Sequence, residues 1–235
     1  MSPTDPPLPG EPIVITRDAL RDGSLLARVR ANPLPGMVVR TDAEIEASLD
    51  TTLATRDPAQ DVWLFAYGSL MWNPAIHTVG SHPALLRGWH RRFCFWVRMG
   101  RGTPERPGLM LGLVRGGACQ GIALRIAAAD ARNELLLVWR REMFASAYLA
   151  RWVNLATADG SVRAITFVAD PKHDGYVANL SDEAVASYLA TASGALGTSR
   201  EYLQQTVAHL HDLHLHDSRL ERLERMIEQQ SPDAA

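Results

Sequence analysis

The order of the expected secondary-structure elements constrains the fold of this chain more than any other feature of its sequence. Several strands come first, then one helix, then two strands joined at Asp159–Gly160. A helical segment is expected from Asp170 onward, with capping-box patterns at 198–201 and 218–221 that open two helices. A doubly wound parallel sheet would need regular alternation of strands and helices, which this order lacks. We therefore expect an α+β protein with a mixed or antiparallel sheet, either open or closed into a small barrel.

Each strand is predicted from its own pattern of apolar residues. Residues 62–66 are continuously apolar, which is typical of a short strand buried on both faces. Residues 85–98 alternate in polarity and indicate a longer strand. Gly116 and Gly117 separate two further apolar segments, which predicts a hairpin. The other expected elements are strands over 109–114, 121–126, 148–155 and 162–168, and a helix that Asp130 caps and that runs to about Phe144.

Residues 1–60 are expected to form an N-terminal extension that packs on a main body comprising residues 61–235. Residues 1–12 carry five prolines and predict a tail that is either disordered or ordered only by contacts. Thr41 and Glu44 then form a capping-box pattern, and apolar residues recur at helical spacing from Ile45. A helix with one apolar face needs a surface to cover, so we do not expect the extension to be an independent domain.

Composition and charge exclude several classes of protein. The 235 residues include 24 basic and 26 acidic side chains, a net charge of −2, so a nucleic-acid-binding protein is not expected. The longest apolar runs are far too short to cross a membrane. The first 12 residues lack the basic and apolar regions of a secretion signal, which favours a cytoplasmic location. Cys94 and Cys119 do not have the spacing of zinc ligands and are expected to be reduced core thiols.

The turn after the first strand is a candidate binding site for a carboxylate or an oxyanion. Backbone N–H groups freed at a glycine-containing turn can form an anion-binding nest. The alternative interpretation is a plain strand-end turn whose apolar side chains belong to the core. A nucleophilic serine at position 69 is disfavoured, because the Gly-x-Ser-x-Gly pattern fails at both flanking positions. The residues of this candidate site are Ala66, Tyr67, Gly68, Ser69, Leu70 and Met71.

Glu142 is the candidate general acid and base. It follows Leu135, Val138 and Trp139 at a spacing that places it on the apolar face of the predicted helix. Loss of hydration there would raise its pKa and make it suitable for proton transfer near neutral pH. The alternative interpretation is a buried ion pair with Arg98 or another arginine.

Two other segments contain side chains of interest. The loop over 100–108 contains Arg101 and Arg106 and would suit an anionic substrate, although a solvated loop is the favoured interpretation. Four histidines lie within residues 209–216. On a continuous helix only His209 with His216, and His211 with His214, would come near each other, so a polar helix surface is favoured over a metal site.

Six sequence motifs in order resemble the ChaC-type gamma-glutamylcyclotransferases. The resemblance extends over about residues 13–225, and a short segment at 15–18 (Ile-Thr-Arg-Asp) is similar to bacterial members. The motifs are residues 63–74 (Trp-Leu-Phe-Ala-Tyr-Gly-Ser-Leu-Met-Trp-Asn-Pro), 88–94 (Gly-Trp-His-Arg-Arg-Phe-Cys), 100–103 with 106–108 (Gly-Arg-Gly-Thr and Arg-Pro-Gly), 139–143 (Trp-Arg-Arg-Glu-Met), 170–173 (Asp-Pro-Lys-His), and 193–203 with Ser-Gly, Leu-Gly-Thr and Tyr-Leu.

The resemblance implies a small mixed β-barrel with flanking helices and a glutathione-specific activity that forms 5-oxoproline and cysteinylglycine. It implies Glu142 as the catalytic residue and residues 66–71 as the substrate-binding loop, with Arg106, Tyr148 and Tyr202 near the substrate. It implies neither a cofactor nor a metal. Two alternatives remain open, namely activity on other gamma-glutamyl amines or amino acids, and a non-catalytic regulatory protein of the same fold. The sequence does not indicate an oligomeric state.

Overall fold

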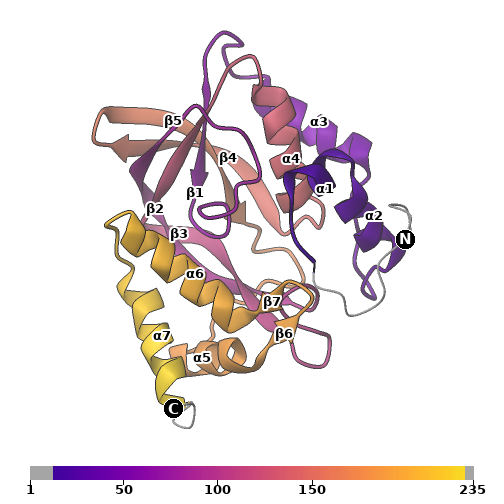
Figure 1. The fold of residues 1–235 in the computed structure, drawn as a ribbon, viewed down its shortest axis with the longest axis vertical. Helices are drawn as coiled ribbons and strands as arrows, with labels where there is room; N and C mark the ends of the chain where they lie inside the picture. The colour runs from indigo at the N-terminus through magenta and orange to yellow at the C-terminus, as the bar shows by residue number, and fades with distance from the viewer. Residues whose placement is uncertain (1–12, 231–235) are drawn as a thin grey trace.

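The computed structural model describes residues 13–230, so the predicted tail over 1–12 lies outside the described residues. At the centre of this part of the chain is a closed barrel with strand order β1-β3-β2-β4-β5 (Figure 1). Parallel pairing of β5 with β1 closes the barrel, whereas the neighbouring strands β1–β3, β3–β2, β2–β4 and β4–β5 are antiparallel. The mixed α+β barrel is thereby confirmed. The strands are β1 (Val62–Ala66), β2 (Gly80–Val97), β3 (Gly108–Ile126), β4 (Tyr148–Thr157) and β5 (Gly160–Ala169).

The predicted hairpin around Gly116 and Gly117 is wrong, because β3 continues through both glycines as one strand. Opposite them β2 has only Gly88, since Arg87 pairs with Ala118 and Trp89 pairs with Arg115. All three glycines have positive φ angles, 81° at Gly88 and 102° and 65° at the other two. The glycines therefore form an irregularity that bends a long two-stranded ribbon rather than a turn that ends it.

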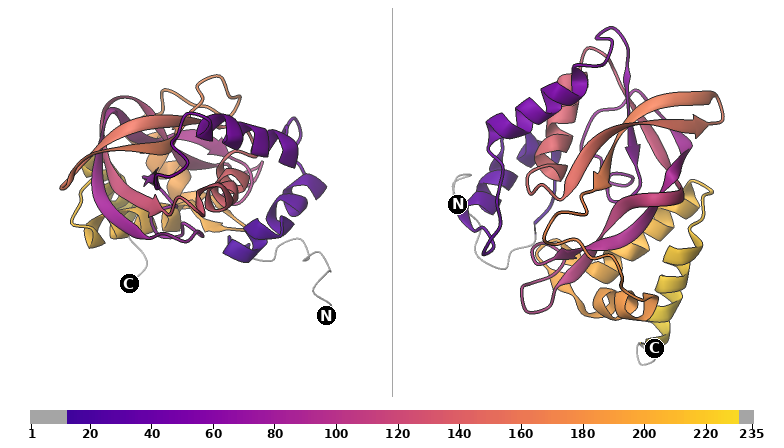
Figure 2. Two further views of the ribbon diagram at one scale, coloured as in Figure 1. Left: turned by 90° about the horizontal axis from the view of Figure 1, so that it is seen from above. Right: turned by 180° about the vertical axis from the view of Figure 1, so that it is seen from behind.

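The N-terminal helices lie beside α4 on one side of the barrel (Figures 1 and 2). The expected capping box of Thr41 and Glu44 is present, and Ile45 and Leu49 are fully buried. Asp130 precedes α4 as predicted, but its side chain makes no capping hydrogen bond. The helices of this region are α1 (Arg17–Arg21), α2 (Ser24–Ala31), α3 (Asp42–Leu53) and α4 (Ala131–Glu142).

A partly buried ion pair joins the extension to α4. Arg17 donates two hydrogen bonds, of 2.5 and 2.6 Å, to the carboxylate of Glu134, which also accepts the backbone N–H of His77. Burial alone would raise the pKa of Glu134, but these donors lower it below its usual value. Arg140 of α4 in turn donates to the carbonyl oxygen of Leu20. The contacts support an extension that lies on the body, while the division of the chain at residue 60 stays a prediction.

Three helices, α5 (Asp182–Thr191), α6 (Ser199–Asp212) and α7 (Ser218–Gln230), cover another side of the barrel (Figure 1). The helical segment starts at Asp182 rather than at Asp170, because residues 171–181 contain a proline and a glycine and run along β2. The short strands β6 (Ser193–Gly194) and β7 (Gly197–Thr198) precede α6, which has the expected capping box. The box expected at Ser218 is wrong, since Asp217 accepts the first free N–H groups of α7.

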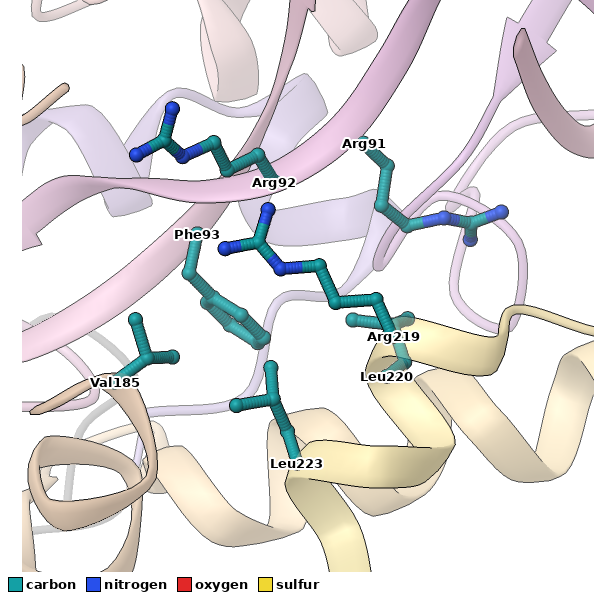
Figure 3. A pocket seen from close by; sticks show the side chains of 7 residues that line it. All are labelled: Arg91, Arg92, Phe93, Val185, Arg219, Leu220 and Leu223. Carbon is teal, nitrogen blue, oxygen red and sulfur yellow. The ribbon is translucent and has the colours of Figure 1, made fainter. Parts of the chain in front are cut away.

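Apolar side chains fill the space between β2 and the C-terminal helices. Phe93 points from β2 toward Val185 of α5 and Leu223 of α7 (Figure 3). The guanidinium groups of the preceding residues, Arg91 and Arg92, point in opposite directions. This packing leaves Arg91 on the side that faces the turn after β1. Among the described helices, none combines the length and apolarity needed to cross a bilayer.

Candidate active site

Glu142 is the last residue of α4, at the end of a face that is otherwise apolar. Leu135, Val138 and Trp139 are fully buried, as their spacing predicted. Only 16% of the Glu142 side chain is exposed. This burial raises the pKa of its carboxyl group, although the neighbouring guanidinium of Arg141 partly opposes the shift. The desolvated environment that the helix spacing predicted for Glu142 is therefore present.

Arg141 connects Glu142 to the turn after β1. Its Nε lies 3.0 Å from Oε1 of Glu142, Nη2 donates to Oγ of Ser69 at 2.7 Å, and Nη1 donates to the carbonyl oxygen of Asn73 at 2.5 Å. Sequence reasoning did not single out this residue, because adjacent residues on a helix normally point in different directions. The ion-pair partner of Glu142 is thus Arg141 and not Arg98, which is exposed.

In the described part of the chain, the turn over residues 67–71 has free backbone N–H groups, whereas most of its side chains are buried. Within residues 13–230 no acceptor is found for the amide groups of Gly68, Ser69 and Leu70, whereas Met71 donates to the carbonyl oxygen of Gly68. The side chains of Ala66, Leu70 and Met71 are buried in the core. The main chain of this turn therefore has the free donors that an anion-binding nest needs.

Arg91 binds the backbone at the start of this turn. Its Nη1 donates to the carbonyl oxygen of Tyr67 at 2.7 Å, and Nη2 donates to the carbonyl oxygen of Gln120. Nε lies 3.0 Å from the carboxylate of Asp217, just before α7. Arg91 is another residue that sequence reasoning missed. It lies two residues before the buried Phe93, a spacing that places both side chains on one face of the strand, and this spacing is the sequence signal for its burial.

Three buried tyrosines lie close enough to Glu142 for its charge to affect them. Burial raises the pKa of Tyr67 and of Tyr148 well above the usual value and raises that of Tyr202 to about 12, and the charge of Glu142 adds to each shift. The hydroxyl of Tyr67 donates to the carbonyl oxygen of Phe167, and that of Tyr148 donates to Leu111. The structure thus brings Tyr148 and Tyr202 together with the turn and with Glu142.

The two arginines of the loop over 100–108 lie in different places. Arg101 packs its guanidinium on the ring of Tyr202, 5.3 Å from the ring centre, and donates to the carbonyl oxygen of Thr198. Arg106 is exposed and lines a hollow beside Tyr188 of α5. The structure therefore places Arg101, rather than Arg106, against the tyrosine cluster. A substrate-binding role for Arg106 stays a prediction.

The fold defines the class of protein first. The barrel superposes on the crystal structure of a yeast gamma-glutamyl cyclotransferase specific to glutathione with a TM-score of 0.67, over 72% of this chain and 96% of the yeast chain. The two sequences are 18% identical, so this similarity concerns the fold alone. The chain thus has a gamma-glutamyl cyclotransferase fold.

Sequence comparison then defines the family. The family described as ChaC-like protein matches residues 62–230. The glutathione-specific gamma-glutamylcyclotransferase of Escherichia coli strain K12 is 39% identical over 211 residues, which cover 89% of this chain and 90% of that protein. Glutathione-specific gamma-glutamylcyclotransferase 1 of Mus musculus is 30% identical over 152 residues, which cover 63% of this chain and 68% of that protein. The chain belongs to the ChaC family, as its ordered motifs indicated.

Proposed function

We propose that this protein cyclises the gamma-glutamyl group of glutathione and releases 5-oxoproline and cysteinylglycine. The observation that carries the proposal is a buried carboxyl group with a raised pKa, Glu142, which Arg141 ties to a turn with free backbone donors. The E. coli relative that is 39% identical carries the name of this activity. The reaction needs no protein nucleophile, because the substrate amine can attack its own γ-carbonyl group.

In the first step, the α-amine of the glutamyl group forms a bond to the γ-carbonyl carbon and closes a five-membered ring. The amine is mostly protonated at neutral pH, so it first loses one proton to solvent, and it loses a second proton as the new bond forms. The Glu142 carboxylate accepts this second proton. Packing of the substrate against the buried Tyr67, Tyr148 and Tyr202 would favour a bent glutamyl chain, in which the amine and the carbonyl carbon are close enough to react.

In the second step, the bond between the γ-carbon and the cysteinyl nitrogen breaks. Protonated Glu142 gives its proton to this nitrogen, so cysteinylglycine leaves as a neutral amine and the carboxylate is restored. Between the steps the former carbonyl oxygen carries a negative charge. The amide groups of Gly68, Ser69 and Leu70 are the donors that would stabilise this oxyanion.

The close approach of Gly68 to Tyr202 gives a test of the turn. A Cβ atom at position 68 would lie 2.9 Å from the Tyr202 hydroxyl oxygen, and Trp72 and Phe93 pack edge-on against the Tyr202 ring and limit its movement. Such overpacking costs about 1–3 kcal/mol. We therefore expect Gly68→Ala to raise KM for glutathione about tenfold.

The matched control for Gly68→Ala is the same substitution in a Tyr202→Phe background. Removing the hydroxyl removes the clashing atom, so Gly68→Ala should raise KM less in this background than in the parent. An equal increase in both backgrounds, or an unchanged KM in the single variant, would show that the turn does not meet the substrate in this way.

The experiment that tests the proposed function is an assay of the purified protein with reduced glutathione, in which 5-oxoproline and cysteinylglycine are quantified. A panel of gamma-glutamyl amino acids and amines is assayed in parallel. Turnover of glutathione alone supports the proposal, and turnover of the panel instead favours the broader cyclotransferase. A folded protein that turns over none of these compounds would be a non-catalytic member of the fold. A cytoplasmic location stays a prediction.

A further inference from the structure

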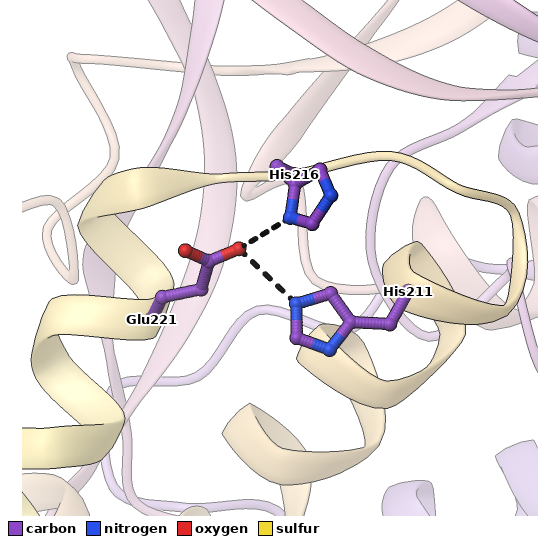
Figure 4. Close-up of side chains that lie close together, drawn as sticks. All are labelled: His211, His216 and Glu221. Atoms are coloured by element: carbon purple, nitrogen blue, oxygen red, sulfur yellow. Dashed lines mark hydrogen bonds and ion pairs between the residues drawn. The ribbon is translucent and has the colours of Figure 1, made fainter.

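Three metal-ligating side chains meet at the junction of α6 and α7, outside the candidate active site. His211 lies in the last turn of α6, His216 in the connection, and Glu221 in the first turn of α7 (Figure 4). Sequence reasoning paired these histidines differently because it assumed one continuous helix. Instead α6 ends at Asp212, and His214 adopts a left-handed conformation with a φ of 55°, which turns the chain back and brings His216 beside His211.

The spacing of the ligand atoms is close to that of a metal site. Oε1 of Glu221 lies 3.1 Å from Nε2 of His211 and 3.1 Å from Nδ1 of His216. Ligand atoms from all three residues lie within 4.8 Å of one another. Ligands bound about 2.0–2.1 Å from a tetrahedral zinc ion are about 3.3 Å apart. Small rotations of the imidazole rings would therefore bring three ligands around one ion.

The backbone of the junction is already fixed. The N–H of His214 donates to the carbonyl oxygen of His211, and the N–H of Leu215 donates to that of Leu210, both at 2.8 Å. Asp217 caps α7 directly after His216. The side chains of His211 and His216 are 48% and 72% exposed, which leaves room for an ion and for water. Metal binding here would order side chains only, so its entropic cost is small.

We propose that His211, His216 and Glu221 bind a divalent transition-metal ion of the zinc class, with water as the fourth ligand. Two imidazole nitrogens and one carboxylate oxygen form a ligand set that suits zinc. Glu224, one turn further along α7, adds negative charge near His211. The bound ion would fasten α7 to α6 and hold the position of Asp217, whose partner Arg91 binds the carbonyl oxygen of Tyr67.

Cobalt titration tests this site independently of catalysis. The full chain, metal-free and without an affinity tag, is titrated with Co²⁺ in a buffer that contains no thiol, because thiols compete for the ion. We expect visible absorption of four-coordinate Co²⁺ that saturates at one equivalent and that Zn²⁺ abolishes. His216→Ala and Glu221→Gln should each weaken binding at least about tenfold.

His214→Asn is the matched control, because it removes a neighbouring exposed imidazole and asparagine tolerates the left-handed conformation. It should bind Co²⁺ as the parent does. Thermal unfolding without metal establishes that each variant is folded, and Zn²⁺ should raise Tm only for the parent and the control. Binding that persists in His216→Ala and Glu221→Gln, or the lack of a saturable signal in the parent, would overturn the proposal.

Discussion

Glu142→Gln is expected to lower kcat for glutathione by about 10²- to 10⁴-fold, the usual contribution of a positioned acid and base. Glutamine keeps the size of the side chain but neither accepts nor gives the proton that both steps require. Thermal unfolding should show an intact fold. The pKa of Glu142 is raised in the folded protein, so its ionised form costs stability at neutral pH, and the neutral amide avoids that cost.

The pH dependence of the parent enzyme distinguishes proton transfer from a structural role. The carboxylate is the active form, so kcat/KM should fall as the pH drops through the Glu142 pKa. Because that pKa is raised, the fall should lie above the usual glutamate value of about 4.3. Activity of Glu142→Gln within a few-fold of the parent, or an unchanged acidic limb in its residual activity, would remove Glu142 from the mechanism.

Arg141→Met is expected to cause the second large effect, on stability and on the pH profile together. It leaves Glu142 buried without its ion-pair partner, a change that typically costs about 3–5 kcal/mol. The guanidinium of Arg141 lowers the Glu142 pKa, so its loss should raise that pKa further. The acidic limb of kcat/KM should therefore move to higher pH, measured beside the free energy of unfolding.

Arg141→Lys is the control for Arg141→Met. Lysine keeps the positive charge but cannot reach Glu142, Ser69 and Asn73 at once, because those contacts use three separate nitrogens of the guanidinium. We expect the acidic limb of the kcat/KM profile to stay near its parental position. KM should rise, because the turn is held by fewer hydrogen bonds. If the limb does not move in Arg141→Met, the positioning role of Arg141 is wrong.

Local sequence patterns were sufficient where an element depends on its own residues. The apolar run of β1, the capping boxes at Thr41 and Thr198, and the apolar face of α4 are examples, since each requires only neighbours along the chain. The burial of Glu142 followed from the same periodicity. The two glycines in β3 look like a turn when considered alone, but in the structure they lie opposite the single Gly88 of β2 as a bulge, and β3 continues through them.

The site could be predicted only in part, because its remaining contacts join segments far apart in the sequence. Arg141 reaches Ser69 and Asn73 across about 70 residues, and Arg101 reaches Tyr202 across about 100. No local pattern indicates which arginine of a loop will face a tyrosine on a distant helix. The same holds for Asp217, which replaces Ser218 as the helix cap while it also pairs with Arg91.

Asn73 links the N-terminal extension to the candidate active site. Its carbonyl oxygen accepts the hydrogen bond from Arg141, while its side-chain amide donates to the carbonyl oxygen of Ile15 at 2.9 Å. Asn73 thus connects Arg141, which pairs with Glu142, to the N-terminal extension. A truncated protein that starts at residue 62, where the family match begins, would lack that acceptor. The smallest unit expected to work at full rate is therefore longer than the segment that defines the family.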